Sequence, residues 1–182
     1  MKKISLFSYF KSLDLHCVSA TEAIRQSLGV TSLKYLRRFT YWELEFDTNS
    51  DQEVHSYLDI LLSRSYYILN PNKEAYYLNS LPSKTGDSLC YLVKVDRQVG
   101  SNVQGLVQKI NQKLPVNLIN VSSSTLWEIG MDSSSVSNDD VRTFVENRII
   151  CSQNREAGIL VNPIFESYKL LDPVTIYESI LT

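Results

Sequence analysis

An internal repeat constrains the fold of this chain more than any other feature of its sequence. The motif Asn-Pro-x-x-Glu-x-Tyr occurs once in each half at one constant offset (162 − 70 = 168 − 76 = 92), as Asn70, Pro71, Glu74 and Tyr76 and as Asn162, Pro163, Glu166 and Tyr168. Trp42 recurs as Trp127 at an offset of 85 (127 − 42), so the second copy has seven more residues (92 − 85) between its tryptophan and its motif. An insertion of this size fits a longer helix or loop and keeps the order of elements. We therefore interpret the chain as two versions of one small unit.

The composition narrows the class of protein. With 18 Lys and Arg residues against 20 Asp and Glu residues, the formal net charge is −2, and no basic stripe indicates binding to nucleic acid or to an anionic membrane. The three cysteines are widely spaced and form no CxxC, which fits a reducing cytosol better than a disulfide framework. No apolar run is long enough to span a bilayer, and no signal-peptide cleavage site follows the apolar residues near the start. We expect a soluble, cytoplasmic protein.

Alternating and helical patterns predict the elements of the first copy. Residues 41–47 are the clearest strand, because apolar and acidic residues alternate along them. Capping boxes at Ser19 and Ser50 predict where two helices begin, and Gly29 is the expected end of the first helix. The second helix is expected to run to Asn70-Pro71. The remaining strands of this copy are expected at 4–10, 33–39 and 74–78.

The second copy repeats this order. Its strands are expected at 89–95, 116–121, 126–131 and 166–171, and its helices at 101–114 and 137–151. Each copy then reads β-α-β-β-α-β, which folds most simply as an antiparallel sheet with both helices on one face. The predicted fold class is α+β, with two ferredoxin-like units packed as an intramolecular pseudodimer, either side by side or sheet to sheet. The expected divisions are a first repeat at 1–80, a linker at 81–88, a second repeat at 89–172 and a C-terminal tail at 173–182.

Residues with the spacing of a catalytic or metal site are missing from the sequence. His16 and His55 are not at metal-ligand spacing with a cysteine or with each other. No phosphate-binding loop, dinucleotide fingerprint or nucleophile elbow is present. Glu43 and Glu45 share a strand face, which indicates a solvent-facing pattern more simply than a catalytic carboxylate pair. We therefore predict no catalytic residue, no cofactor-binding residue and no metal ligand.

The remaining candidates are contact residues. Arg37 and Arg38 lie between two predicted strands, where they are either an exposed basic pair or a contact to an anionic partner or ligand. In the two Asn-Pro turns, proline fixes φ and stops a helix, while asparagine can bond the neighbouring backbone. We take these turns as structural supports for a contact surface. The 11 tyrosines also favour an interaction protein, because tyrosine suits partly buried contact surfaces.

Further matches around these motifs indicate a family that the sequence resembles. Each motif follows an apolar pair, Ile68-Leu69 or Leu160-Val161. In the first copy, Leu28-Gly29 precedes the basic pair and the strand Tyr41-Trp42-Glu43-Leu44. In these features the chain resembles a tandem fusion of two copies of PurS, the small subunit of phosphoribosylformylglycinamidine (FGAM) synthase. The Asp-Pro-x-Gly that usually follows the first strand in that family is absent from both copies.

The resemblance implies a non-catalytic subunit. In this family a glutaminase subunit releases ammonia, and an ATP-dependent synthetase subunit uses it to convert formylglycinamide ribonucleotide to the amidine. PurS pairs bridge the two and help the ammonia to pass between them. The resemblance therefore implies PurL-type synthetase and PurQ-type glutaminase subunits as partners in de novo purine biosynthesis, with no cofactor, no nucleic acid and no membrane. Further self-association of the pseudodimer stays open.

Other classes of function remain as alternatives. A tandem ACT-like small-molecule sensor shares this element order and also pairs, but only Val99-Gly100 offers the glycine-containing ligand loop that such a domain has after its first strand. An RNA-binding sheet domain is disfavoured by the charge and by the lack of an aromatic RNP-like run. A dimeric ferredoxin-like enzyme would have no evident base.

Overall fold

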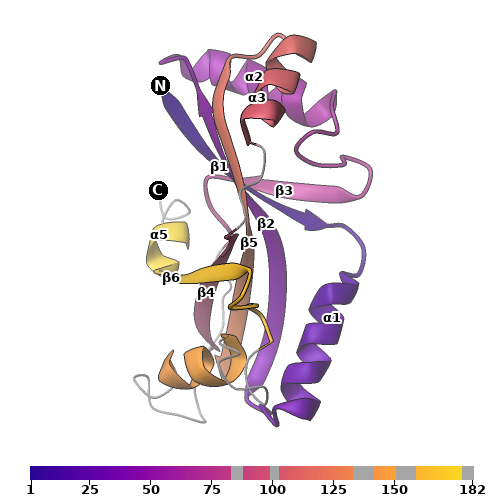
Figure 1. Cartoon of the computed structure of the whole chain (residues 1–182), viewed down its shortest axis with the longest axis vertical. Helices are drawn as coiled ribbons and strands as arrows, with labels where there is room; N and C mark the ends of the chain where they lie inside the picture. Colours follow the sequence, from indigo (N-terminus) through magenta and orange to yellow (C-terminus); the bar gives the residue numbers. More distant parts are fainter. Residues whose placement is uncertain (83–87, 99–102, 133–141, 151–158, 178–182) are drawn as a thin grey trace.

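One antiparallel sheet of six strands organises the described part of the chain (Figure 1). The structure, a computed structural model, describes residues 1–82, 88–98, 103–132, 142–150 and 159–177. The strand order is β3-β1-β2-β5-β4-β6, so each half of the chain contributes one half of the sheet. The strands are β1 (Lys2–Phe10), β2 (Leu33–Phe46), β3 (Glu74–Leu78), β4 (Ser88–Arg97), β5 (Leu118–Asp132) and β6 (Glu166–Leu171). The predicted α+β class is confirmed.

The helices connect these strands. They are α1 (Leu15–Glu22), which continues into a π-helical turn over Ala23–Ser27, α2 (Asp51–Ser63), α3 (Val103–Lys113), the helical residues 142–150 and α5 (Pro173–Tyr177). Among the described residues, no helix is long and apolar enough to cross a membrane.

Two strands predicted in each copy are one continuous strand in the structure. The stretches 33–39 and 41–47 merge into β2, and 116–121 and 126–131 merge into β5. Only Thr40 separates the first two stretches, and the tightest common hairpin needs two loop residues. Residues 122–125 are three serines and a threonine, without a glycine or proline to break the strand. The predicted order β-α-β-β-α-β is therefore wrong, since each half contributes three strands to the described sheet.

The strand registers repeat an offset that is present in the sequence. Leu6 of β1 lies between Trp42 and Leu78, and Val93 of β4 lies between Trp127 and Leu170. The outer neighbours, Leu78 and Leu170, are 92 positions apart (170 − 78), which is the offset between the two Asn-Pro motifs. The two halves of the sheet therefore pair their strands in the same way.

The first helix begins earlier than the sequence predicts. Asp14 is its N-cap, and the Asp14 carboxylate accepts the backbone N–H groups of His16 and Cys17 at 3.0 and 3.4 Å. These bonds satisfy donors that the start of a helix leaves open. Ser19 lies inside the helix, so the capping box predicted there is wrong. Gly29 follows the helix with a φ of 67°, the left-handed conformation expected at a helix end.

The start of the second helix is confirmed, but its predicted end is not. The Ser50 hydroxyl accepts the backbone N–H of Glu53 at 3.3 Å, as the capping box requires. The helix α2 ends at Ser63, well before Asn70-Pro71, and a loop fills the interval. Its predicted apolar face is buried, and it consists of Val54, Leu58, Leu61 and Leu62.

Two hydrophobic clusters cover one face of the sheet, and each takes helices from both halves of the chain. The α2–α3 cluster buries Leu58 of the first half against Ile110 of the second. The α1 cluster joins Ile24 of the first half to Ile149 of the second. Figure 1 shows α2 and α3 at one end of the sheet and α1 with the helical residues 142–150 at the other. The two halves are therefore interleaved rather than packed as separate bodies.

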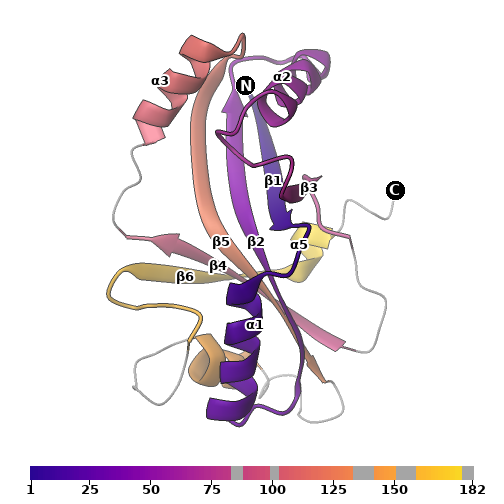
Figure 2. The same ribbon diagram turned by 90° about the vertical axis from the view of Figure 1, so that its right-hand side faces the viewer.

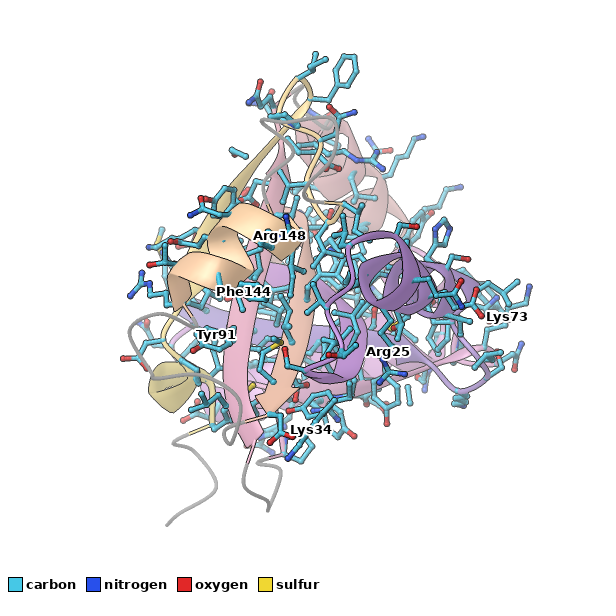
Figure 3. The ribbon with its side chains drawn as sticks, turned by 90° about the horizontal axis from the view of Figure 1, so that it is seen from below. Arg25, Lys34, Lys73, Tyr91, Phe144 and Arg148 are labelled. Carbon is cyan, nitrogen blue, oxygen red and sulfur yellow. The ribbon has the colours of Figure 1, made fainter. Side chains whose placement is uncertain are left out.

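Hydrogen bonding strengthens this interleaving at the α1 end. Arg148 Nη2, from the second half, donates to the backbone carbonyl of Leu28 in the first half at 3.2 Å. Seen from below, Arg148 and Phe144 come from one helix, and Tyr91 comes from the neighbouring strand β4 (Figure 3). Phe144 and Tyr91 pack at the border of the α1 cluster.

The C-terminal segment covers part of the opposite sheet face. On that face Phe7, Phe39 and Leu126 are buried in a third cluster with Leu81, against which Ile176 and Tyr177 pack. The backbone N–H of Leu81 donates to the carbonyl of Ile176 at 3.3 Å. The copies thus lie side by side in one sheet and not sheet to sheet. Residues 83–87 of the expected linker and 178–182 of the expected tail lie outside the described residues.

Candidate interaction surfaces

The first Asn-Pro-x-x-Glu-x-Tyr motif forms a closed turn at the start of β3. The Glu74 carboxylate accepts the backbone N–H of Asn70 at 2.7 Å, and the Asn70 carbonyl accepts the N–H of Glu74 at 2.8 Å. The Asn70 side-chain oxygen accepts the N–H of Asn72 at 3.0 Å. Pro71 fits between them because it fixes φ and brings no N–H that needs an acceptor. The Asn, Pro and Glu of the motif are therefore explained by the turn itself.

The second motif closes in the same way at the start of β6. The N–H of Asn162 donates to the Glu166 carboxylate at 2.9 Å, and the Asn162 carbonyl accepts the N–H of Glu166 at 2.8 Å. The Asn162 side-chain oxygen accepts the N–H of Ile164 at 3.1 Å. Pro163 holds the same place as the proline of the first turn. Two turns with one hydrogen-bond pattern lie at the starts of the two edge strands, β3 and β6.

The side chains that the two turns expose are different. The first turn surface carries Asn72 and Lys73, followed on the strand by Tyr76, which is 42% exposed. The second turn surface carries Ile164 and Phe165, which are 73% and 57% exposed. Its strand tyrosine, Tyr168, is 36% exposed. One backbone geometry therefore presents a polar surface at one edge of the sheet and an apolar surface at the other.

Arg37 and Arg38 point to opposite faces of the sheet, so they do not form one basic site. On the helix-bearing face, Arg38 Nε and Nη2 donate to the Asp14 carboxylate at 2.8 and 3.1 Å. On the other face, Arg37 Nε donates to Glu128 at 2.6 Å, and its Nη2 forms an ion pair with the same carboxylate. Both arginines lie within the continuous strand β2 rather than at a strand end. The fold therefore uses both guanidinium groups internally.

Glu128 is fully buried, at 0% exposure, and it centres a polar cluster that the sequence did not predict. The Tyr35 hydroxyl donates to Glu128 at 3.0 Å. The Cys90 thiol lies 4.0 Å from the same carboxylate and 3.5 Å from the hydroxyl of Tyr177 in α5. Burial is the main cause that raises the pKa of Tyr35, of Tyr177 and of the Cys90 thiol above their ordinary values. This cluster ties the C-terminal helix to the sheet.

The sequence signal for this cluster was incomplete. The Trp-Glu pair repeats in both halves, which marks Glu43 and Glu128 as equivalent positions (43 + 85 = 128). Period-2 alternation indicates which face a residue shares, but it does not tell what covers that face. In the structure Glu43 stays half-exposed and pairs with Lys94 at 3.1 Å, whereas the equivalent Glu128 is covered. The nearby C-terminal helix was not predicted, so its contribution was missed.

A groove of about 580 Å³ lies beside α1, along the part of β2 that β1 does not reach. Its aromatic lining includes Tyr9, Phe10, Phe39 and Tyr77. Along the edge of β2, Arg25 Nη2 donates to the carbonyls of Leu33 and Lys34 at 2.9 Å each, and Cys17 donates to the carbonyl of Leu36 at 2.9 Å. Figure 3 labels Arg25 and Lys34 at this end of the molecule. Side chains of the first helix thus occupy carbonyls that a neighbouring strand would otherwise use.

Several other expected features can be placed directly. Val99 and Gly100, the expected loop of a ligand sensor, lie outside the described residues. Within the described ranges, no group of three or more His, Cys, Asp or Glu side chains is arranged to hold a metal ion. Comparison of the chain with protein-family models, with curated proteins and with solved structures found no match.

Proposed function

We propose that this chain is a non-catalytic bridging subunit of an FGAM synthase complex in de novo purine biosynthesis. In this role it supports assembly of the complex and the transfer of ammonia from a PurQ-type glutaminase to a PurL-type, ATP-dependent synthetase. The partners are those two subunits, in the cytoplasm, and the chain itself contributes no cofactor.

The observation that carries the proposal is the agreement between two repeats. The sequence motif that the chain shares with PurS recurs at an offset of 92 (162 − 70), and the strand registers reproduce this offset independently (170 − 78). Both motifs also close with the same set of hydrogen bonds. This supports a duplicated PurS-like unit that does in one chain what a pair of PurS chains would do.

We also propose that the sheet contains two interleaved ferredoxin-like units. One unit consists of β3, β1, the second part of β2 and the first part of β5, with α2 and α3 on its face. The other consists of β6, β4, the second part of β5 and the first part of β2, with α1 and the helical residues 142–150. The composition of the two hydrophobic clusters supports this division. Each unit then borrows one helix and half of one strand from the other repeat.

The different chemistry of the two turn surfaces supports a bridge between two unlike partners. The turns lie at the starts of the two edge strands, and both strands belong to one continuous sheet. One partner would contact the polar first turn surface, and the other would contact the apolar second turn surface. The sheet would then hold the two partners at a fixed spacing. A symmetric chain with two identical turns would not distinguish them.

An assembly experiment tests this proposal. The purified chain is mixed with separate synthetase and glutaminase subunits, and the mixture is analysed by size-exclusion chromatography with light scattering. We expect one complex that contains all three chains and that does not form when this chain is omitted. If the two large subunits assemble equally well without it, and if neither binds it, the bridging role is wrong. Titration with amino acids, followed by calorimetry, then tests the ACT-like sensor alternative.

A further inference from the structure

The middle of the helix-bearing sheet face is left uncovered between the two groups of helices. Leu36 and Leu44 of β2 are buried under opposite groups, whereas Thr40, halfway between them, is exposed. Ser123 of β5 is exposed beside it. Residues 38–42 span about 13 Å at about 3.3 Å per residue, which is close to the width of one helix or one extended segment with its side chains. Figure 2 shows β2 and β5 crossing this space, with α2 and α3 at one end of it and α1 at the other.

We call residues 38–42 of β2, with the paired residues 123–127 of β5, the strip. An approximate twofold relation organises its residues. Trp42 and Trp127 are equivalent by the repeat, and so are Arg38 and Ser123 (38 + 85 = 123). In the sheet, Arg38 lies opposite Trp127, and Ser123 lies opposite Trp42. The same two pairings thus occur on the two sides of the strip, but one has an arginine where the other has a serine.

The arginine side of the strip is occupied. The Arg38 guanidinium carbon lies 5.9 Å from the centre of the Trp127 ring, within the range of a cation–π contact. Its nitrogens are held by the Asp14 carboxylate at 2.8 and 3.1 Å. Trp127 is buried. The fold itself therefore shows how a guanidinium group fits against this tryptophan.

The serine side of the strip has no such cation among the described residues. Trp42 is only partly buried. Its Nε1 atom is buried without a hydrogen-bond partner in the described structure, and because it is a donor it takes no part in binding a guanidinium group. Thr40 and Ser123, which are both exposed, place two hydroxyl groups beside the indole.

The chemistry of this site is complementary to a guanidinium group. The face of an indole ring carries negative electrostatic potential, and hydroxyl oxygens accept hydrogen bonds from N–H donors. Arginine fits better than lysine, because its planar group can stack on the ring while its N–H groups reach acceptors at the rim. We propose that Trp42 and the exposed hydroxyls of Ser123 and Thr40 receive an arginine side chain of a partner protein, in the position that Arg38 holds on Trp127. The proposal is independent of the FGAM synthase assignment.

The test uses the full chain and a small probe. The indole N–H resonances of Trp42 and Trp127 are followed by NMR during titration with N-acetyl-arginine methylamide. The matched control ligand is the citrulline analogue, which has nearly the same shape without the charge. We expect a saturable shift of the Trp42 resonance with the arginine probe, and only a small shift with the citrulline probe or at Trp127.

A second variant controls the location of the site. Ser123→Arg places a guanidinium group opposite Trp42 within the chain, so it is expected to abolish the probe-dependent shift while the protein stays folded. Ser123→Gln, which adds length without charge, is expected to weaken the shift much less. Equal shifts with both probes, no shift at Trp42 in the native chain, or an undiminished shift in Ser123→Arg would each overturn the proposal.

Discussion

Thr40 and Thr125 face each other in the central β2–β5 pair, and they are equivalent residues of the two repeats (40 + 85 = 125). Pairing of a residue with its own counterpart places an approximate twofold axis between them. At this point β2 passes from one hydrophobic cluster to the other, and so does β5. The continuous strand at Thr40 is therefore the feature that joins the two copies into one sheet.

We predict a large difference between two equivalent glutamates. Glu128→Ala removes the partner of the partly buried Arg37 and leaves its charge uncompensated, which costs about 3–5 kcal/mol of unfolding free energy. Glu43→Ala removes a half-exposed partner of Lys94, which costs less than about 1 kcal/mol. Urea denaturation of both variants measures the difference. Similar losses in the two variants would show that Glu128 is not in a buried ion pair.

We predict that the protein loses stability in alkaline solution. Burial raises the pKa of Tyr35, Tyr177 and Cys90, so the folded protein keeps protons that the unfolded chain has already lost. This contribution is complete below the ordinary pKa values, about 8.5 for cysteine and about 10 for tyrosine, and it is lost as the pH rises above them. Urea midpoints measured between neutral pH and about pH 10.5 should fall, and the fall should be smaller in Tyr177→Phe. A midpoint that stays constant over this range contradicts the burial of these groups.

We predict unequal roles for the two tryptophans. Trp42 and Trp127 are equivalent in the repeat, and the structure places them at equivalent strand positions with unequal burial. Trp127→Ala should cost about 3–5 kcal/mol, because it leaves a cavity in the α1 cluster. Trp42→Ala should cost clearly less, since part of its ring is already in contact with water. Thermal melts of the two variants, compared with the native chain, decide the order.

We predict that the second turn surface can be changed without damage to the fold. The double variant Ile164→Asn with Phe165→Lys gives this turn the residues of the first, and both native side chains are mostly exposed. The melting temperature should stay within a few degrees, because surface substitutions usually change stability by less than about 0.5 kcal/mol. Binding to one of the two large subunits should be lost, as measured by surface plasmon resonance.

A substitution at an exposed apolar residue outside the second turn is the control for that experiment. Leu13 is 71% exposed and lies in the loop before α1, which adjoins the first turn through Lys11 and is not part of the second. Leu13→Asn should leave unchanged the binding that the second-turn variant loses. If the turn variant binds both subunits as the native chain does, the second turn surface is not a contact site.

Local features of the sequence predicted local structure well. The Ser50 cap, the apolar face of α2 and the strand Glu166–Leu171 are set by residues within a few positions of one another, and the structure has them. The union of two predicted strands at Thr40 was missed because periodicity alone does not tell whether a chain continues or turns. The length of the interval does tell, since one residue is too short for a hairpin, and pairing with β5 then runs along the whole strand.

The candidate sites could likewise be predicted only where they depend on residues close together in the sequence. The turn motif was visible as a repeat, and its asparagine and glutamate bond each other within four residues, so their structural role could be anticipated. The separation of Arg37 and Arg38 onto opposite faces follows from alternation in a strand, but only once β2 is known to be continuous. The burial of Glu128 depends on α5, a segment outside the repeat.

Reconstitution of the reaction with two nitrogen donors tests the central claim most directly. FGAM formation is measured with the separate synthetase and glutaminase subunits, with or without this chain, and with either glutamine or ammonium as the donor. The chain alone should have neither FGAM synthase nor glutaminase activity. We predict that the glutamine-dependent reaction requires the chain, whereas the ammonium-dependent reaction depends on it much less, because no ammonia has to be handed over. Full glutamine-dependent activity in the absence of the chain would contradict its role as the bridging subunit.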